Sequence, residues 1–339
     1  MRTMGIAGLL AAGALAGCQT SAIVARHGTA SVMALGETSP VGSASADAAD
    51  DPAIWRNPRN PAASLIVATD KKAGLYVYGL DGKSRSFEAA GRLNNVDLAD
   101  LGARGVIVVA SDRNDPAAAL LRVYRLDTAK ATLVPLGAVP GGAGEAYGVC
   151  LWRNGAALHA FSVLKDGTIE EARIDLAGAT ATSAVVRRLK LATQAEGCVA
   201  DPRDGTLYVG EEDVGIWRFA PGAKAGELLA RADGSHLVAD VEGLALTPQG
   251  KRGGFLVASS QGDNAYAVYR LPDMTPVGRF RIVAGRFGAT EETDGIAVAT
   301  GNFGTGLRGG MFVAQDGVNG AAQNFKLVSW AAIRQAVGQ

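Results

Sequence analysis

The chain has 339 residues, of which 48% are apolar and 19% are charged, with 45 glycines and 12 prolines. This composition suits a large apolar core and excludes a disordered chain. Lysine plus arginine and aspartate plus glutamate each number 33, so the net charge is zero. Overall electrostatics therefore argue against a nucleic-acid or anionic-membrane partner, and any charged ligand must be bound by local clusters.

The N-terminus has the pattern of an export signal. Met1-Arg2 gives a positive start, Gly5 to Gly13 is apolar, and Leu15-Ala16-Gly17-Cys18 resembles a bacterial lipobox. We expect residues 1–17 to be a signal peptide and Cys18 to be lipidated; an ordinary signal peptide with an incidental cysteine is the alternative. Gln19 favours the outer membrane, and no later stretch has the apolar length that spans a bilayer. The protein is thus expected to be an outer-membrane lipoprotein, or periplasmic or extracellular.

The rest of the chain consists of short apolar runs separated by Gly, Asp and Asn, which predicts an all-β structure. One signature recurs along it: an acidic or polar residue, a small or apolar residue, then an apolar run. The spacing is roughly 45 to 50 residues, the period of a four-stranded propeller blade. The copies are Asp51–Trp55, Asn95–Leu98, Tyr147–Leu151, Glu196–Val199, Glu242–Leu246 and Asp294–Val298.

A second apolar run follows each copy and is expected to form the next strand of the same blade. These runs are Leu65–Thr69, Gly105–Ala110, Leu158–Val163, Thr206–Gly210, Gly254–Ala258 and Gly310–Ala314. Six copies predict a six-bladed β-propeller, a single domain over residues 29–339, expected to be a monomer. Because an open ring would leave a sheet edge unpaired, we expect Thr29 to Ser39 to supply the outer strand of the last blade.

Cys150 and Cys198 both fall in predicted strands and would lie in an oxidising compartment after export. They are either a disulfide or two buried thiols, and the sequence leaves this open.

Acidic residues recur at equivalent places in the repeat. Those that open first strands are Asp50, Asp51, Asp97, Glu196, Asp240, Glu242 and Asp294, and those that follow second strands are Asp70, Asp112, Glu211, Glu212, Asp213 and Asp316. Both places lie at one rim of a propeller, so these carboxylates are expected to converge. Their mutual repulsion would be relieved by Ca²⁺, which takes about six to eight oxygen ligands.

Aspartate beside glycine also forms turns, and we assign that role to Asp81-Gly82 and Asp166-Gly167. For the pairs Asp50-Asp51 and Asp240-x-Glu242 and for Glu211-Glu212-Asp213 we favour metal ligation. Basic residues are interleaved with the same rim, namely Lys71, Lys72, Arg113 and Lys165. Such cations together with Ca²⁺ are what a polyanionic phosphate ester requires.

These motifs resemble the β-propeller phytases, alkaline calcium-dependent phosphohydrolases of myo-inositol hexakisphosphate. The resembling stretches run in order from about residue 45 to the C-terminus. They are Asp47–Trp55, Thr69–Tyr78, Asn94–Leu98, Gln194–Cys198, Thr206–Trp217, Asp240–Leu244, Ala258–Gly262, Glu292–Ile296 and Phe312–Gly317.

The resemblance implies roles for single residues. It implies active-site calcium ligands at Asp51, Glu196, Glu212, Asp240, Glu242, Gln261 and Asp294, and a separate stabilising calcium at Asp316. It implies that Lys71, Lys72, Arg113 and Lys165 bind substrate phosphates, and that Tyr147 and Glu170 lie near the substrate. The implied catalytic set is Lys71, Arg113, Tyr147, Lys165, Glu170, Glu196 and Glu212.

The reaction expected from this resemblance is direct attack on phosphorus by a water that several calcium ions activate, with no covalent enzyme intermediate. Two positions depart from the family pattern. Ala99 and Ala297 stand where the family often has a charged residue, which affects calcium affinity or pH optimum more than the reaction. The alternatives are a calcium-dependent propeller lactonase or phosphotriesterase, and a propeller that only binds partners.

Overall fold

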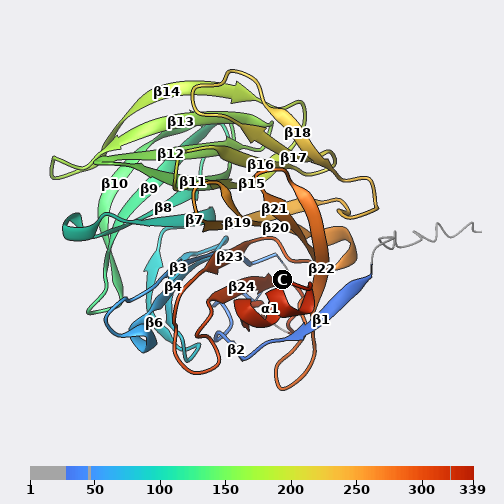
Figure 1. Ribbon diagram of the computed structural model, residues 1–339. Helices are drawn as coiled ribbons and strands as arrows, with labels where there is room; N and C mark the ends of the chain where they lie inside the picture. The colour runs from blue at the N-terminus through green and yellow to red at the C-terminus, as the bar shows by residue number, and fades with distance from the viewer. Residues whose placement is uncertain (1–27, 45–46, 321) are drawn as a thin grey trace, which may run out of the picture.

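The computed structural model describes residues 28–44, 47–320 and 322–339, which fold into six sheets around a central channel (Figure 1). This arrangement confirms the predicted all-β, six-bladed propeller. The expected signal peptide and Cys18 lie outside the described residues. In the described ranges, none of the helices combines the length and apolarity needed to cross a bilayer.

The first three blades each have four antiparallel strands, running from the channel to the outer edge. Blade 1 comprises β3 (Ala49–Trp55), β4 (Leu65–Asp70), β5 (Gly74–Gly79) and β6 (Ser84–Ala89). Blade 2 comprises β7 (Leu93–Asp100), β8 (Val106–Asp112), β9 (Ala118–Asp127) and β10 (Thr132–Ala143). Blade 3 comprises β11 (Ala146–Asn154), β12 (Ala157–Leu164), β13 (Thr168–Asp175) and β14 (Thr182–Lys190).

The last three blades follow the same order. Blade 4 comprises β15 (Ala195–Ala200), β16 (Leu207–Glu211), β17 (Gly215–Phe219) and β18 (Glu227–Arg231). Blade 5 comprises β19 (Val241–Gln249), β20 (Gly253–Ser260), β21 (Ala265–Leu271) and β22 (Thr275–Val283). Blade 6 comprises β23 (Ile296–Ala299), β24 (Met311–Asp316) and β25 (Asn324–Ser329). Three short 3₁₀ helices lie in connections between strands of one blade: η1 (Pro61–Ala63), η2 (Gly102–Arg104) and η3 (Gln261–Asp263).

The first strand of each blade contacts the first strand of the next, and β23 contacts β3, so the ring is closed. Between blades the sheets pack face to face through apolar side chains. Val67 and Val77 of blade 1, for example, share one buried cluster with Val108 and Tyr124 of blade 2. Because both faces of an inner strand are covered, its sequence is a near-continuous apolar run.

The N-terminal segment closes the ring differently from the prediction. Only β2 (Gly36–Glu37) forms the outer strand of blade 6, where it pairs with β25. β1 (Thr29–Met33) instead pairs in parallel with β22 and becomes a fifth strand of blade 5. One segment thereby covers two sheet edges, whose N–H and C=O groups would otherwise be unpaired.

The chain ends in the short helix α1 (Trp330–Ala336), whose N-cap Ser329 accepts a hydrogen bond from the Ala332 N–H at 3.3 Å. Trp330 packs edge-on against Phe255 with ring centroids 6.2 Å apart, and the helix contacts β1. Both ends of the described chain therefore lie on blades 5 and 6.

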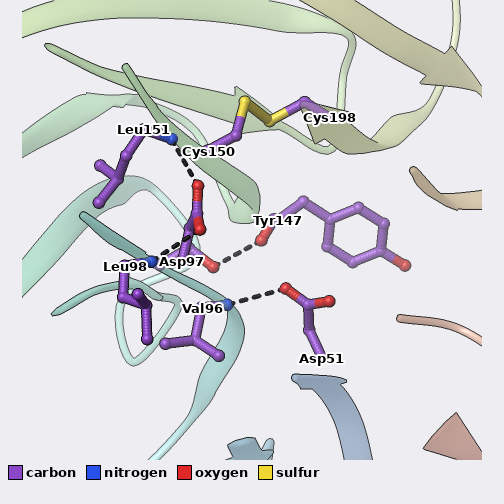
Figure 2. The surroundings of a disulfide bond; sticks show 9 residues. Asp51, Val96, Asp97, Leu98, Tyr147, Cys150, Leu151 and Cys198 are labelled. Atoms are coloured by element: carbon purple, nitrogen blue, oxygen red, sulfur yellow. Dashed lines mark hydrogen bonds between the residues drawn. A yellow bond between two sulfur atoms is a disulfide. The ribbon is translucent and has the colours of Figure 1, made fainter. Parts of the chain in front are cut away.

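One disulfide and two side-chain hydrogen bonds join the inner strands of neighbouring blades (Figure 2). Cys150 of β11 and Cys198 of β15 form a disulfide, with Cα atoms 5.8 Å apart, which answers the question that the sequence left open. The Asp51 carboxylate accepts the Val96 N–H at 3.0 Å, and the Asp97 carboxylate accepts the Leu151 N–H at 2.8 Å. Each aspartate thus satisfies a backbone donor of the next blade.

Candidate functional site

The candidate site lies at the rim where the first strands begin and the second strands end. Most first strands start with an irregularity in their pairing to the second strand. The register shifts enclose Asp50-Asp51, Asn94-Asn95, Tyr147, Glu196-Gly197 and Glu242-Gly243. A bulge turns its side chain away from the regular sheet alternation. The repeat signature therefore marks the residues that the fold directs toward the rim.

The glycine of the Glu-Gly signature has a structural cause. A Cβ on Gly197 would overlap the carbonyl oxygen of Glu242 in the next blade, and one on Gly148 would overlap that of Glu196. The inner strands approach so closely here that only glycine fits. This close approach brings acidic residues of adjacent blades together.

Three glutamates form the centre of the site. Glu196, Glu212 and Glu242 each offer a carboxylate oxygen, and these oxygens all lie within 4.8 Å of one another. All three residues are buried, and the Oε2 atom of Glu242 has no hydrogen-bond partner among the described residues. We define these three residues as the glutamate cluster.

The electrostatics of the glutamate cluster favour a bound cation. Burial, followed by the charge of Asp50, raises the pKa of Glu196 well above its usual value. Burial, followed by the charge of Glu196, does the same for the pKa of Glu242, and burial also raises the pKa of Glu212. A hard dication with oxygen ligands would relieve this repulsion and use the unpartnered oxygen, so these residues fit a Ca²⁺ site.

Two amide side chains orient the glutamate cluster. Asn94 Nδ2 donates to Glu196 Oε1 at 2.7 Å, and Gln194 Nε2 donates to Glu212 Oε1 at 2.8 Å. Sequence reasoning included both residues in recurring motifs but assigned them no role. Asn94 stands one residue and Gln194 two residues before the repeat signature, and that position was the signal available.

Lys71 occupies a second acidic group beside the glutamate cluster. Its ammonium lies 2.9 Å from Asp50 Oδ1 and 2.9 Å from Asp294 Oδ2, and it also contacts Asp47. Burial disfavours the ammonium, but Asp50 and Asp294 together raise the pKa of Lys71 well above its usual value. Burial raises the pKa of Asp294 to about 7 although Lys71 opposes that change.

Gln261 and Lys72 complete this group. Gln261 Nε2 donates to Asp294 Oδ1 at 2.7 Å, and Lys72 pairs with Asp47 at 2.9 Å. The implied ligand Asp294 and the implied phosphate-binding Lys71 are therefore in direct contact. The amide and the two lysines hold the acidic group in place.

Arg113 and Lys165 both lie close to the ring of Tyr147, the candidate active-site tyrosine. The Arg113 guanidinium carbon is 5.6 Å, and Lys165 Nζ 5.2 Å, from the centre of the Tyr147 ring. Arg113 also donates to Asn94 Oδ1, which links it to the glutamate cluster through one amide. Burial, followed by the charge of Glu196, raises the pKa of Tyr147, so its hydroxyl stays protonated.

Four of the implied residues have other surroundings. Asp51 binds the Val96 N–H on the channel side, and burial followed by Asp50 raises its pKa well above the usual value. Asp240 is half-buried, with its pKa raised by burial and then by Asp213. Glu170 pairs with Arg188 on the outer strand of blade 3 at 2.7 Å, and Asp316 pairs with Lys326 at 3.0 Å.

The acids that end second strands do not all join the site, contrary to the expected convergence. Asp70 accepts the Ser43 N–H at 3.0 Å, Asp112 pairs with Arg122 at 2.6 Å, and Glu211 accepts the Trp217 Nε1–H at 2.7 Å. Each of these acids therefore satisfies a partner in or beside its own blade. The turn assignments are confirmed, since Asp81 and Asp166 each accept the N–H two residues ahead.

Comparison with known proteins gives the following similarities. A family model described as Phytase matches residues 2–339. The 3-phytase of Bacillus subtilis (strain 168) is 40% identical over 330 residues, which cover 91% of this chain and 86% of that protein. Among solved structures, the crystal structure of BBS1N in complex with ARL6DN covers 78% of this chain and 74% of that chain. Its sequence identity is 11% and its TM-score 0.47, which carries no argument about function.

Proposed function

The chain belongs to the phytase family, and on that premise we propose that it hydrolyses phosphate monoesters of myo-inositol hexakisphosphate with the help of Ca²⁺. The observation that carries this proposal is the buried glutamate cluster beside cations that are held in place on one tyrosine. Acids without cations would suit a simple metal-binding protein, and cations without acids would suit an anion-binding one.

Glu196, Glu212 and Glu242 are the residues that would hold Ca²⁺, with Asp294 and Gln261 next to them. Bound Ca²⁺ would coordinate the phosphate and lower the pKa of the attacking water. The Asn94 and Gln194 amides fix the directions of two carboxylates and so pre-organise the ligand set.

Arg113 and Lys165 would bind the oxygens of the phosphate. Their positive charge would stabilise the negative charge that develops on these oxygens during phosphoryl transfer. Their contact with the Tyr147 ring limits the positions of two otherwise flexible side chains. The protonated Tyr147 hydroxyl can donate one further hydrogen bond to a phosphate oxygen. Lys71 neutralises Asp50 and Asp294 and lowers the repulsion that a polyanionic substrate meets at this rim.

The test is phosphate release from myo-inositol hexakisphosphate with Ca²⁺, with EDTA, and with Ca²⁺ restored. We expect release to stop under full chelation and to return with Ca²⁺. Release that persists under full chelation would contradict the calcium mechanism. Activity on a lactone or a phosphotriester but not on the inositol phosphate would favour the alternative hydrolase classes.

We further propose that the protein is exported and anchored by a lipid on Cys18, as Leu15-Ala16-Gly17-Cys18 indicates. Metabolic labelling with a palmitate analogue should mark the wild type and not Cys18→Ser. Equal labelling of both proteins, or labelling of neither, would contradict this.

A further inference from the structure

The face opposite the candidate site is surrounded by positive charge. Each blade connects its first strand to its second through a turn on this face, and we call the six segments 56–64, 101–105, 155–156, 201–206, 250–252 and 300–310 the basal turns. Five of the basal turns carry at least one arginine or lysine, and Arg153 lies near the end of β11, just before the sixth. These residues, the basal ring, are Arg56, Arg59, Arg104, Arg153, Arg203, Lys251, Arg252 and Arg308.

The basal ring is largely unneutralised. The basal turns hold two acids, Asp201 and Asp204, and a third, Asp100, ends β7 on the same face. Within residues 28–44, 47–320 and 322–339, Arg203 is the one member paired with a carboxylate, that of Asp201, while Arg153 binds backbone carbonyls. Further out on the same face some cations are paired locally, as in Arg85 with Asp81 and Lys130 with Asp127. Positive charge without a carboxylate partner therefore surrounds the mouth of the channel.

This distribution changes what the zero net charge means. The rim of the candidate site gathers carboxylates and the basal ring gathers cations, so the two signs are separated along the channel axis. A neutral total of 33 positive and 33 negative residues thus conceals one strongly basic face. Such a face attracts an anionic surface even though the whole molecule is neutral.

One part of the basal ring has room for a headgroup. A cavity of about 320 Å³ between blades 4 and 5 is lined by four cations and two acids, namely Arg203, Arg218, Lys251, Arg252, Asp201 and Asp204, and Asp201 pairs with Arg203. A phosphate with its glycerol moiety fits this volume. The other basic residues stand on exposed turns, which suits a broad surface better than one small ligand.

The direction in which the chain enters the domain is compatible with a membrane on the basal face. β1 runs parallel to β22, which leads from the basal side toward the rim of the candidate site. Thr29 lies beside Arg279, halfway along β22, so the chain enters the domain in the direction away from the basal face. A membrane anchor N-terminal to Thr29 is thus compatible with the basal ring facing the membrane.

We propose that the basal ring docks on a lipid surface with anionic headgroups, and that the candidate site then faces away from that surface. Each lysine or arginine near an anionic bilayer contributes about fivefold to binding, and salt screens the contribution within about 10 Å. This docking is independent of the proposed phosphatase activity.

The test is sedimentation of the full chain with vesicles of phosphatidylglycerol and phosphatidylcholine in equal parts, against phosphatidylcholine alone. The basal variant carries Arg59→Gln, Arg104→Gln, Lys251→Gln, Arg252→Gln and Arg308→Gln. The matched control variant carries five exposed substitutions outside the turns of the basal face, namely Arg92→Gln, Arg173→Gln, Lys190→Gln, Arg231→Gln and Arg286→Gln. All three proteins also carry Cys18→Ser, so that no lipid anchor contributes to vesicle binding.

We expect the wild type and the control variant to bind the anionic vesicles at 50 mM salt and to be released at 500 mM salt. The basal variant should bind at least about a hundredfold more weakly. Phosphate release from soluble substrate should be unchanged in both variants, which shows that they are folded.

Equal binding of basal variant and wild type, or an equal loss in the control variant, would overturn the proposal. In a last experiment, millimolar inorganic phosphate is added to the wild-type protein bound to anionic vesicles. If it releases the wild type no better than sodium chloride of equal ionic strength, the lipid surface is supported; selective release by phosphate would assign the ring to free phosphate and overturn the proposal.

Discussion

At Glu242, burial of a carboxylate lowers the stability of the metal-free protein, and the same carboxylate is a candidate metal ligand. Glu242 lies in a bulge, buried beside two other glutamates, with one oxygen that has no hydrogen-bond partner in the described chain. An arrangement that destabilises the metal-free protein would, under the proposed function, supply ligands once a cation is present. Stability without metal and activity with metal are therefore expected to respond in opposite directions.

Glu242→Gln tests this opposition. The amide keeps the shape but removes a buried charge, so the melting temperature without calcium should rise by about 2 °C or more. Phosphate release at saturating calcium should fall about a hundredfold or more, because a metal supplies several kcal/mol of charge stabilisation. Glu88→Gln on the outer strand of blade 1 is the control and should change neither quantity. A variant that is less stable without calcium would contradict the electrostatic account.

The same carboxylates predict how stability depends on pH. Burial raises the folded-state pKa of Glu196 and Glu242 and brings that of Asp294 to about 7, so the folded state binds more protons than the unfolded chain. This contribution to the free energy of unfolding is complete below about pH 4 and is lost as pH rises toward and beyond 7.

Other acids give the stability of the protein the opposite dependence on pH, because His159 and Arg187 lower the pKa of Glu171 despite its burial. The measurement therefore compares a variant with the wild type, so that the contribution of these other acids cancels. The melting temperature of metal-free Glu196→Gln/Glu242→Gln minus that of the wild type should increase from pH 5 to pH 8. A difference that is constant with pH would contradict the assignment.

At the scale of elements, the bulge and the glycine that follows it position the site. The bulges of β15 and β19 bring Glu196 and Glu242 together because the two strands pass at a distance that only glycine permits. The disulfide between β11 and β15 ties blade 3 to blade 4 on the same inner strands. The geometry of the ligand set is thus a property of strand spacing as well as of side chains.

Gly197→Ala should separate the two strands. The added methyl group meets the Glu242 carbonyl, and such overpacking costs about 1–3 kcal/mol. We expect weaker calcium binding by calorimetry together with a lower melting temperature. Gly36→Ala is the matched control, since its nearest neighbour would lie at 3.9 Å, and it should bind calcium as the wild type does. Normal calcium binding by Gly197→Ala would show that strand spacing does not set the site.

The sequence predicted the architecture because each blade repeats the same chemistry, an acid or amide, a glycine or small residue and an apolar run. The repeat also predicted that acids of different blades meet at one rim, whereas Glu196, Glu212 and Glu242 were named as ligands through the resemblance to the phytase family. The sequence could not predict that Asp51 and Asp97 bind backbone N–H groups of the next blade, because an aspartate that ligates and one that caps a donor look alike in sequence. Nor could it pair Cys150 with Cys198, which depends on a distance between blades.

At the scale of the whole molecule, a buried cation lies where β2 closes the ring on blade 6. The Lys326 ammonium is fully buried in blade 6, 2.6 Å from Glu37 of β2 and 3.0 Å from Asp316. It also donates to Asn324 and Asn319 at 3.0 and 3.2 Å. The stabilising calcium implied at Asp316 stays a prediction, and here an ammonium of the chain itself already balances that carboxylate.

Lys326→Met should therefore weaken closure. It leaves Asp316 buried without its cation, and loss of one partner of a buried pair costs about 3–5 kcal/mol of the free energy of unfolding. Urea denaturation should show this loss, whereas Lys83→Met on an exposed turn should show none. A loss that calcium fully restores would indicate that a metal can take the place of the ammonium.

The position of the two chain ends has a consequence for how the fold can be rearranged. Since α1 contacts β1, a linker from Gln339 to Gly28 would join the ends on blades 5 and 6 without crossing the channel. New ends could then be opened at the turn that holds Gly155, where open space surrounds the backbone. Such a circular permutant would keep every strand pair, because a closed ring of blades has no obligatory starting point.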